Sequence, residues 1–153
     1  MRLGRDWIEA HIPHKGTMCL LEEVLDWSPA SIRCRANSHR SLGNPLRWQG
    51  RLGAACGIEY AAQAMAVHGA LLLDSDEVRA GKLASARGVT LRVARLDDCI
   101  GDLIATAHRV HGGAAMVLYD FTVADSSRVL LAGRATIAFT RPSLNKGAEQ
   151  DDR

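Results

Sequence analysis

The sequence predicts an α+β fold in which one long apolar helix is wrapped by a curved antiparallel sheet. Residues 52–73 form a run of small and apolar residues with almost no polar side chain. Most of the remaining chain alternates apolar and polar residues with the period of two that is typical of strands. A helix that is hydrophobic all round has to be enclosed, and a curved sheet does this. The alanines of the helix allow that sheet to approach closely: Ala54, Ala55, Ala61, Ala62, Ala64 and Ala66.

The segments before the helix are short. We expect the following elements in order: a short helix or turn at 6–11, strands at 18–27 and 31–36, and a polar loop from Asn37 to about Gln49. In the second strand, Ile32, Cys34 and Ala36 share one face, opposite Arg33 and Arg35. This alternation indicates a strand with one buried side.

The segments after the helix predict a succession of antiparallel strands. We expect them at 86–96, 102–110, 115–124 and 129–140, which brings the number of strands to about six. The sequence His111-Gly112-Gly113 is a candidate hairpin turn. In the segment that follows, one face carries the apolar residues Val117, Tyr119, Phe121 and Val123.

Length and charge restrict the classes of function. The 153 residues suffice for one domain, which we place at 1–142, followed by a polar tail at 143–153 that we expect to be disordered. The formal net charge is only +2, the basic residues are scattered, and aromatic residues make up 5%. These values argue against nucleic acid as a partner, although a weak basic bias suits an acidic carrier protein.

The cysteines and the N-terminus indicate a cytoplasmic protein. The four cysteines form no C-x-x-C pair, so we expect reduced thiols. The first fifteen residues carry charges throughout and do not resemble a signal peptide, and no segment predicts membrane insertion. Two H-x-x-H patterns, His11/His14 and His108/His111, each lack a third ligand, so we expect no metal.

The most informative stretch is GIEYAAQAMAVHG, from Gly57 to Gly69. Glu59 and Gln63 lie four residues apart, which places them on the same face of a helix. A carboxylate among apolar residues is costly to keep charged, so burial would raise its pKa. Either Glu59 serves chemistry, or it is a structural carboxyl bonded to Gln63 or to the backbone. Gln63 would then orient Glu59 or contact a second subunit.

Two motifs resemble the hot-dog 3-hydroxyacyl-acyl-carrier-protein dehydratases. The stretch IPHKGTMCLLEEVLDW, from Ile12 to Trp27, resembles the opening L-P-H-R-x-P-x-L-L-x-D-R-V of that family. The stretch GIEYAAQAMA, from Gly57 to Ala66, resembles its I-E-A-M-A-Q-A helix. The resemblance is greatest to the predicted dehydratases of aryl-polyene and xanthomonadin-type pigment clusters, whose helix reads G-I-E-Y-M-A-Q.

The resemblance implies dehydration of 3-hydroxyacyl thioesters on an acyl carrier protein, without a cofactor. Such a reaction needs an acid, a base and N–H donors for the enolate oxygen. Glu59 would be the acid, and His14, in the loop that related enzymes place beside the substrate, would be the base. The N-terminus of the helix, at Gly53 and Ala54, would supply the N–H groups. Trp48 would line the acyl pocket.

One departure from the family pattern leaves the base open. The family's H-F-P-G-H-P segment would fall near 44–46, where this chain has no histidine. His14 is the first substitute, unless it only fixes its loop, and His39 is the second, unless it is a plain surface residue. The alternatives are a non-catalytic acyl-binding or dehydratase-partner subunit and a hot-dog thioesterase. We expect a homodimer or higher oligomer, or a heteromer with a second dehydratase, in which Glu59 and His14 converge at a subunit interface.

Overall fold

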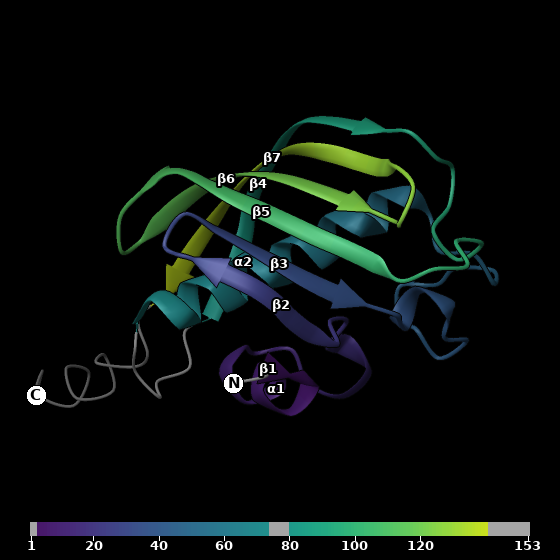
Figure 1. Ribbon diagram of the computed structural model, residues 1–153, viewed down its shortest axis with the longest axis horizontal. Coiled ribbons are helices and arrows are strands. Elements are labelled where there is room, and N and C mark those ends of the chain that lie inside the picture. Colours follow the sequence, from purple (N-terminus) through teal and green to yellow (C-terminus); the bar gives the residue numbers. More distant parts are fainter. Residues whose placement is uncertain (1–2, 74–79, 141–153) are drawn as a thin grey trace, which may run out of the picture.

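The computed structural model describes residues 3–73 and 80–140 (Figure 1). A single antiparallel sheet curves around one long helix, which confirms the expected α+β class. The elements are β1 (Leu3–Gly4), α1 (Arg5–His11), η1 (Gly16–Met18), β2 (Glu23–Ser28), β3 (Ser31–Ala36), η2 (Ser38–Arg40), η3 (Ala54–Cys56), α2 (Gly57–Leu73), β4 (Ala80–Leu91), β5 (Leu103–Gly112), β6 (Met116–Ala124) and β7 (Val129–Thr140). The strand order in the sheet is β1-β2-β3-β5-β6-β7-β4.

Helix α2 is buried because small residues let the sheet come close on several sides. Residues 60–70 of the helix are all buried. A Cβ on Gly57 would lie 2.5 Å from Leu131 Cδ2, and one on Gly69 would lie 2.4 Å from Phe139 Cζ. The helix therefore uses these two glycines to pack against β7.

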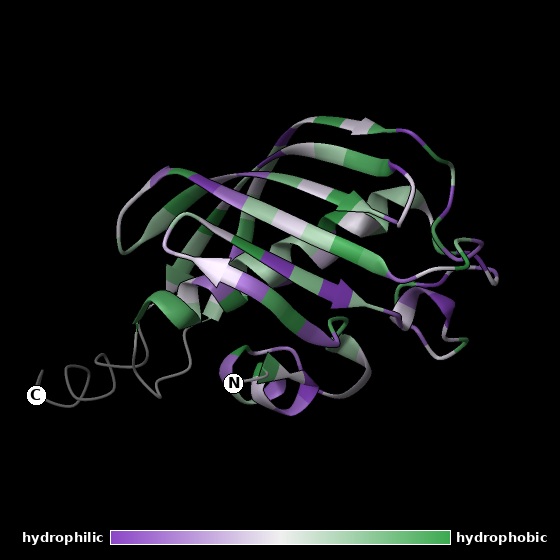
Figure 2. Cartoon of the chain, viewed as in Figure 1, coloured by the Kyte–Doolittle hydropathy of each residue, from purple (hydrophilic) through white to green (hydrophobic). Residues whose placement is uncertain are grey.

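The inner faces of the strands complete one core around α2. Ile32, Cys34 and Ala36 of β3 are buried, as their alternation predicted. The same holds for the expected inner face of β6, which consists of Val117, Tyr119, Phe121 and Val123. In Figure 2 the strands accordingly alternate between apolar and polar colours along their length.

Several expected boundaries were wrong, and hydrogen bonds explain two of them. The long helix does not start at Leu52, because the Leu52 carbonyl accepts the Leu96 N–H at 2.8 Å and Gly53 bridges to Arg95. The expected strand at 18–27 begins only at Glu23, because the backbone at Met18 and Leu20 bonds to the side chain of Gln63 instead. Distant partners thus replace the expected hydrogen bonding at both places: backbone groups at Leu52 and Gly53, and the side chain of Gln63 at Met18 and Leu20.

The remaining differences concern strand ends and small elements. The strand expected at 86–96 runs over Ala80–Leu91, and the hairpin turn expected at 111–113 lies at 113–115. The two-residue β1 and the turn η2 were not expected. The expected tail at 143–153 lies outside the described residues. Within residues 3–73 and 80–140, no helix is both long and apolar enough to cross a bilayer.

Candidate active site

The first full turn of α2 presents Glu59 beside the loop that carries His14. His14 Nε2 lies 3.4 Å from Glu59 Oε1, and the two side chains are 22% and 33% exposed. This separation exceeds the 2.7–3.2 Å of an ordinary N–H···O bond, as catalytic contacts often do before substrate binds. The fold therefore brings together, within one chain, the two groups that we expected to converge at a subunit interface.

The loop of His14 is fixed by its neighbours rather than by His14 itself. Lys15 Nζ donates to the carbonyls of Glu9 and, at 3.0 Å, of Ile12. The Gly16 N–H donates to Glu9 Oε1 at 2.5 Å, and Arg5 donates to the Gly16 carbonyl at 2.8 Å. These bonds leave the His14 imidazole to face Glu59.

His14 keeps one ring nitrogen without a partner. Its Nδ1 is buried and makes no hydrogen bond within the described parts of the chain. The interpretation of His14 as a residue that bonds backbone to fix its loop thus finds no bond to support it there. Nε2 is the nitrogen that faces the carboxylate.

The charge state of Glu59 differs from our expectation. The hydrogen bond from His14 lowers the pKa of Glu59 below its ordinary value, and this effect outweighs the opposing effect of burial. Burial does act to raise this pKa, but the expected net rise was wrong, because an adjacent imidazole favours the carboxylate more strongly than partial desolvation disfavours it. The resting side chain is an anion.

Gln63 holds the polypeptide between His14 and β2. Its Oε1 accepts the Leu20 N–H at 2.9 Å, and its Nε2 donates to the Met18 carbonyl at 2.7 Å. Its amide also lowers the pKa of Glu59, but less than His14 does. Because Gln63 is fully buried, these two backbone bonds are the principal use of its amide.

The segment where the family's histidine would fall is used for structure. The buried Asn44 donates from Nδ2 to Tyr60 Oη and to the Ser38 carbonyl, both at 3.0 Å. Tyr60 in turn lies 2.8 Å from Ser38 Oγ, which donates to the Leu20 carbonyl at 2.8 Å. Asn44 therefore connects the loop before α2 to the segment that Gln63 holds.

The N-terminus of α2 offers backbone donors, but not all those expected. The Ala54 N–H donates to the Ala94 carbonyl at 3.1 Å, so Ala54 is not a free donor, and this expectation was wrong. Gly53 and Ala55, on either side of Ala54, are exposed residues, and in residues 3–73 and 80–140 neither backbone N–H donates to a loop or strand carbonyl. Trp48 is 74% exposed, and it is not among the residues that line the pocket beside α1 or the pocket at 109–112.

A comparison with protein families gives the family of this chain. The model of the ApeP-like family, described as ApeP dehydratase, matches residues 7–148. The chain belongs to the ApeP-like dehydratase family. A comparison with curated proteins found no match.

Solved structures show that the fold is the hot-dog fold. The structure titled "The Dehydratase Heterocomplex ApeI:P from Xenorhabdus doucetiae" matches with a TM-score of 0.76 and 22% identity, covering 88% of this chain and 91% of that chain. Thioesterase HI1161 from Haemophilus influenzae matches with a TM-score of 0.57 and 13% identity over 81% of each chain. Mutant thioesterase PA1618 (Q49A) from Pseudomonas aeruginosa gives 0.56 and 13%, over 77% and 80%.

His39 lies in the interior of this ApeP-like chain. It is fully buried, and its Nε2 donates to the carbonyls of Cys99 and Gly101 at 3.1 and 2.9 Å. Burial lowers the pKa of its imidazole. The expectation of a plain surface residue was therefore wrong, and these bonds assign His39 to joining two loops.

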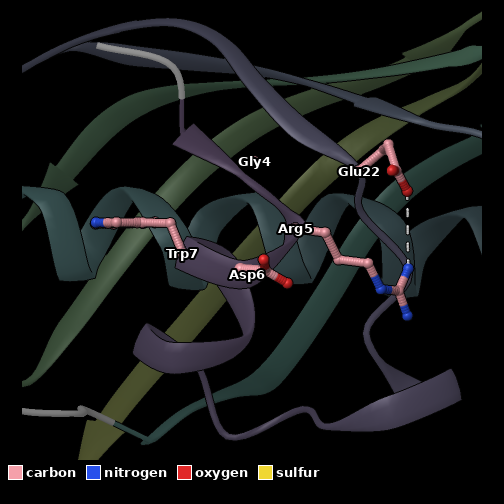
Figure 3. Close-up of a pocket in the computed structure, with 5 residues that line it drawn as sticks. All are labelled: Gly4, Arg5, Asp6, Trp7 and Glu22. Atoms are coloured by element: carbon pink, nitrogen blue, oxygen red, sulfur yellow. Dashed lines mark ion pairs between the residues drawn. The ribbon is translucent and has the colours of Figure 1, made fainter.

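A pocket beside α1 is separate from the Glu59–His14 pair. It is lined by Gly4, Arg5, Asp6, Trp7 and Glu22. Figure 3 shows Arg5 extending toward Glu22, at 3.8 Å, while Trp7 points the other way. Because Arg5 also holds Gly16, this side of α1 supports the loop of His14 from outside.

Sequence analysis missed the supporting residues of the ApeP-like site. Ser38, Asn44 and Tyr60 carried no signal, because each is a common residue whose partners come from other segments. Asn44 could have been noticed only as the residue near the position of the absent histidine. His68, buried on α2, bonds Tyr119 Oη at 2.8 Å and the Ser28 carbonyl at 2.7 Å. It stabilises the core.

Proposed function

We propose that this protein removes water from 3-hydroxyacyl thioesters carried on an acyl carrier protein, in aryl-polyene pigment or fatty-acid-type synthesis. The observation that carries the proposal is the 3.4 Å contact between His14 and Glu59 in a chain of a dehydratase family. An acid and a base that share one face of a site suit an elimination in which a proton and a hydroxyl leave neighbouring carbons.

We infer that Glu59 is the base and His14 the acid, the reverse of the assignment from sequence. The Glu59 carboxylate takes the proton from the carbon next to the thioester carbonyl. The carbon–oxygen bond to the 3-hydroxyl breaks as protonated His14 Nε2 donates its proton, and water leaves an enoyl thioester. Glu59 then holds a proton that passes to neutral His14 to restore the pair.

Backbone donors assist the proposed base. A carboxylate whose pKa is lowered, as that of Glu59 is, can serve as base when hydrogen-bond donors stabilise the enolate oxygen. The N–H groups of Gly53 and Ala55 precede α2, whose N-terminus carries partial positive charge. We assign the thioester oxygen to this position.

We propose that the protein works as an oligomer, and as a heteromer with a second dehydratase in particular. Strand β4 is an edge strand of the sheet, with most of its residues exposed. A long exposed edge pairs readily with another chain. The similar structure from Xenorhabdus doucetiae is a heterocomplex by its title. A homodimer through the same edge is the simpler form, and light scattering of the protein with and without the second dehydratase separates these states; a monomer in both excludes both.

A second candidate function is that of a non-catalytic acyl-binding or dehydratase-partner subunit. Asn44 favours it, because the segment that would hold the family's histidine is occupied by a structural amide. A thioesterase is the third candidate, since thioesterases share this fold.

A purified-protein assay tests the three candidates together. The substrates are 3-hydroxyacyl thioesters on a carrier protein and as free small thioesters, and the readouts are the conjugated enoyl product and free thiol. Enoyl product that is lost in Glu59→Gln supports the proposal. Free thiol overturns it in favour of a thioesterase. Neither product, with or without a second dehydratase, overturns it in favour of a binding subunit.

A further inference from the structure

The three most exposed large apolar side chains of the described residues gather at one end of the molecule. Leu42, Trp48 and Ile100 are 89%, 74% and 90% exposed, whereas the next, Met116, is 52% exposed. Trp48 and its neighbours precede α2, and Ile100 precedes β5, so both loops lie at the right-hand end in Figure 1. Exposed apolar side chains that cluster mark an interaction surface more often than single ones do.

One arginine fixes the backbone under two of these side chains. Arg47 donates to the carbonyls of Ser41 at 2.8 Å, Gly50 at 2.9 Å and His39 at 3.1 Å. Leu42 follows Ser41, and Trp48 follows Arg47 itself. Both apolar side chains are thus attached to a framework that loses little conformational freedom on binding.

A second arginine joins Ile100 to this framework. Arg40 donates to the Ile100 carbonyl and, at 2.7 Å, to Asp102 Oδ1. His39, next to Arg40, bonds the carbonyls on both sides of Ile100. These hydrogen bonds join the two loops to each other.

Trp48 is the residue that precedes a tight two-residue turn. The Trp48 N–H donates to the Arg51 carbonyl at 2.9 Å, and the Arg51 N–H donates back at 3.0 Å. Between them, Gln49 and Gly50 adopt φ values of 51° and 74°, the left-handed conformation of a two-residue hairpin turn. Gln49 is the one non-glycine residue of the described chain in this conformation, so the turn holds Trp48 in solvent at a conformational cost.

The surface is positively charged. Residues 37–58 contain Arg40, Arg47 and Arg51 and no aspartate or glutamate. The loop of Ile100, residues 92–102, adds two arginines and three aspartates, of which Asp97 pairs with Arg95. The two loops together therefore keep an excess of positive charge. Asp102 pairs with Arg40. Arg47 instead donates to neutral carbonyl groups, so no carboxylate among these partners offsets its positive charge. Arg51 forms no ion pair within the described parts of the chain and is exposed. An acidic partner complements this charge, whereas a second copy would present the same arginines.

The surface adjoins the start of α2. Cys56 Sγ, in η3, donates to the Leu46 carbonyl at 3.9 Å, which ties the loop to the turn that leads into the helix. Glu59 follows Cys56 by one turn. A partner seated here is placed to deliver a chain toward the helix N-terminus.

We propose that Leu42, Arg47, Trp48, Arg51 and Ile100 form the docking face for the acidic carrier protein that presents the thioester. The proposal rests on the proposed function and adds the place of the partner to it. Trp48 and Leu42 supply apolar contact, and Arg51 pairs with a carboxylate of the carrier. Tryptophan and arginine are the residues that most often dominate such interfaces.

The test compares carrier-bound and free thioesters in the full-length variants Trp48→Ala and Arg51→Glu. We expect each substitution to raise KM for the carrier-bound substrate about tenfold or more, with kcat/KM for the free thioester unchanged. The effect of Arg51→Glu weakens as salt increases, because the contact is exposed. The control is Met116→Ala: Met116 pairs with Ala138 at the other end of the sheet, and the substitution removes an apolar side chain that is 52% exposed.

The outcomes separate this proposal from the proposed function. Wild-type activity on free and carrier-bound thioesters, with no change in either variant, overturns the docking face alone. Loss of the free-thioester activity in both variants also overturns it, because the face would then be part of the catalytic unit. A change of oligomeric state in Trp48→Ala, seen by light scattering, overturns it in favour of a subunit contact. Absence of all activity in the wild type overturns the proposed function itself.

Discussion

Glu59 gains its chemical character from a single neighbour. On an apolar helix a lone carboxyl is expected to be neutral, yet the contact with His14 keeps it ionised. This difference reverses the two roles in the proposed elimination. At the scale of residues, the partner across the fold matters more than the surroundings within the helix.

Substitution of Glu59 by glutamine tests the role of the carboxylate, because glutamine has nearly the same shape but carries no charge. We expect kcat for the dehydration to fall by a factor of roughly 10² to 10⁴, because the base is lost, with little change in the free energy of unfolding. Glu22→Gln is the matched control, since Glu22 is also 33% exposed and pairs with Arg5 at 3.8 Å. Equal activity of Glu59→Gln and the wild type would contradict the mechanism.

The titration of Glu59 tests the same pair without an assay of activity. We expect its carboxyl pKa, measured by carbon NMR on labelled protein, to lie below 4.5 in the wild type. In His14→Gln the main cause of the lowering is removed while burial remains, so the pKa should rise. A value above 4.5 in the wild type would restore Glu59 to the role of acid.

At the scale of elements, the small residues of α2 allow the strands of the sheet to pack closely against the helix. Gly57 and Gly69 both face β7, but different atoms lie against them: a leucine methyl at Gly57 and the edge of a phenylalanine ring at Gly69. The same helix presents Gln63 to the segment before β2. One helix therefore both packs against β7 and holds the segment before β2.

The two glycines should respond unequally to alanine. Alanine favours a helix by about 1 kcal/mol over glycine, whereas overpacking costs about 1–3 kcal/mol. We expect Gly69→Ala to lower the free energy of unfolding, because the Phe139 ring lies 2.4 Å from the new methyl group and has little freedom to yield. Gly57→Ala should be milder, because Leu131 can change rotamer. Urea denaturation gives both values, and equal destabilisation would contradict the packing argument.

Gln63 should matter for both stability and activity. In Gln63→Leu the Leu20 N–H and the Met18 carbonyl lose their partner, and a buried unsatisfied group costs about 1–3 kcal/mol. The segment after His14 then loosens, so kcat should fall while KM changes less. Urea denaturation and steady-state kinetics measure the two effects. Unchanged stability would show that water replaces the amide.

At the scale of the whole molecule, two buried histidines join distant parts. His39 connects the loop after β3 to the loop before β5, and His68 connects α2 to β2 and β6. Burial lowers the pKa of both imidazoles. The folded state thus holds both as neutral groups.

This arrangement predicts loss of stability in mild acid. Both histidines have folded pKa values below the ordinary 6.5, so the unfolded chain binds more protons as the pH falls through that value. The stability they contribute is present above pH 6.5 and is lost progressively below it. Urea midpoints between pH 7.5 and about 5 measure the effect. A flat profile would contradict the neutral state of these histidines.

The sequence by itself determined the class of fold and the family, and it proposed Glu59 and His14 as site residues. The apolar run around Glu59 predicted an enclosed helix, and the alternation in β3 and β6 predicted the inner faces of the sheet, because both signals are local and periodic. The motifs around His14 and Glu59 indicated the family in the same way. Boundaries near 18–22 and 52–56 were missed, because backbone groups there bond to distant partners.

Only the tertiary structure decided how these residues work. It placed His14 within reach of Glu59, gave Gln63 to the backbone, filled the position of the absent histidine with Asn44, and buried His39. It also gathered Leu42, Trp48 and Ile100 on one surface. Each of these outcomes depends on contacts between segments far apart in the chain, which no local pattern of residues encodes.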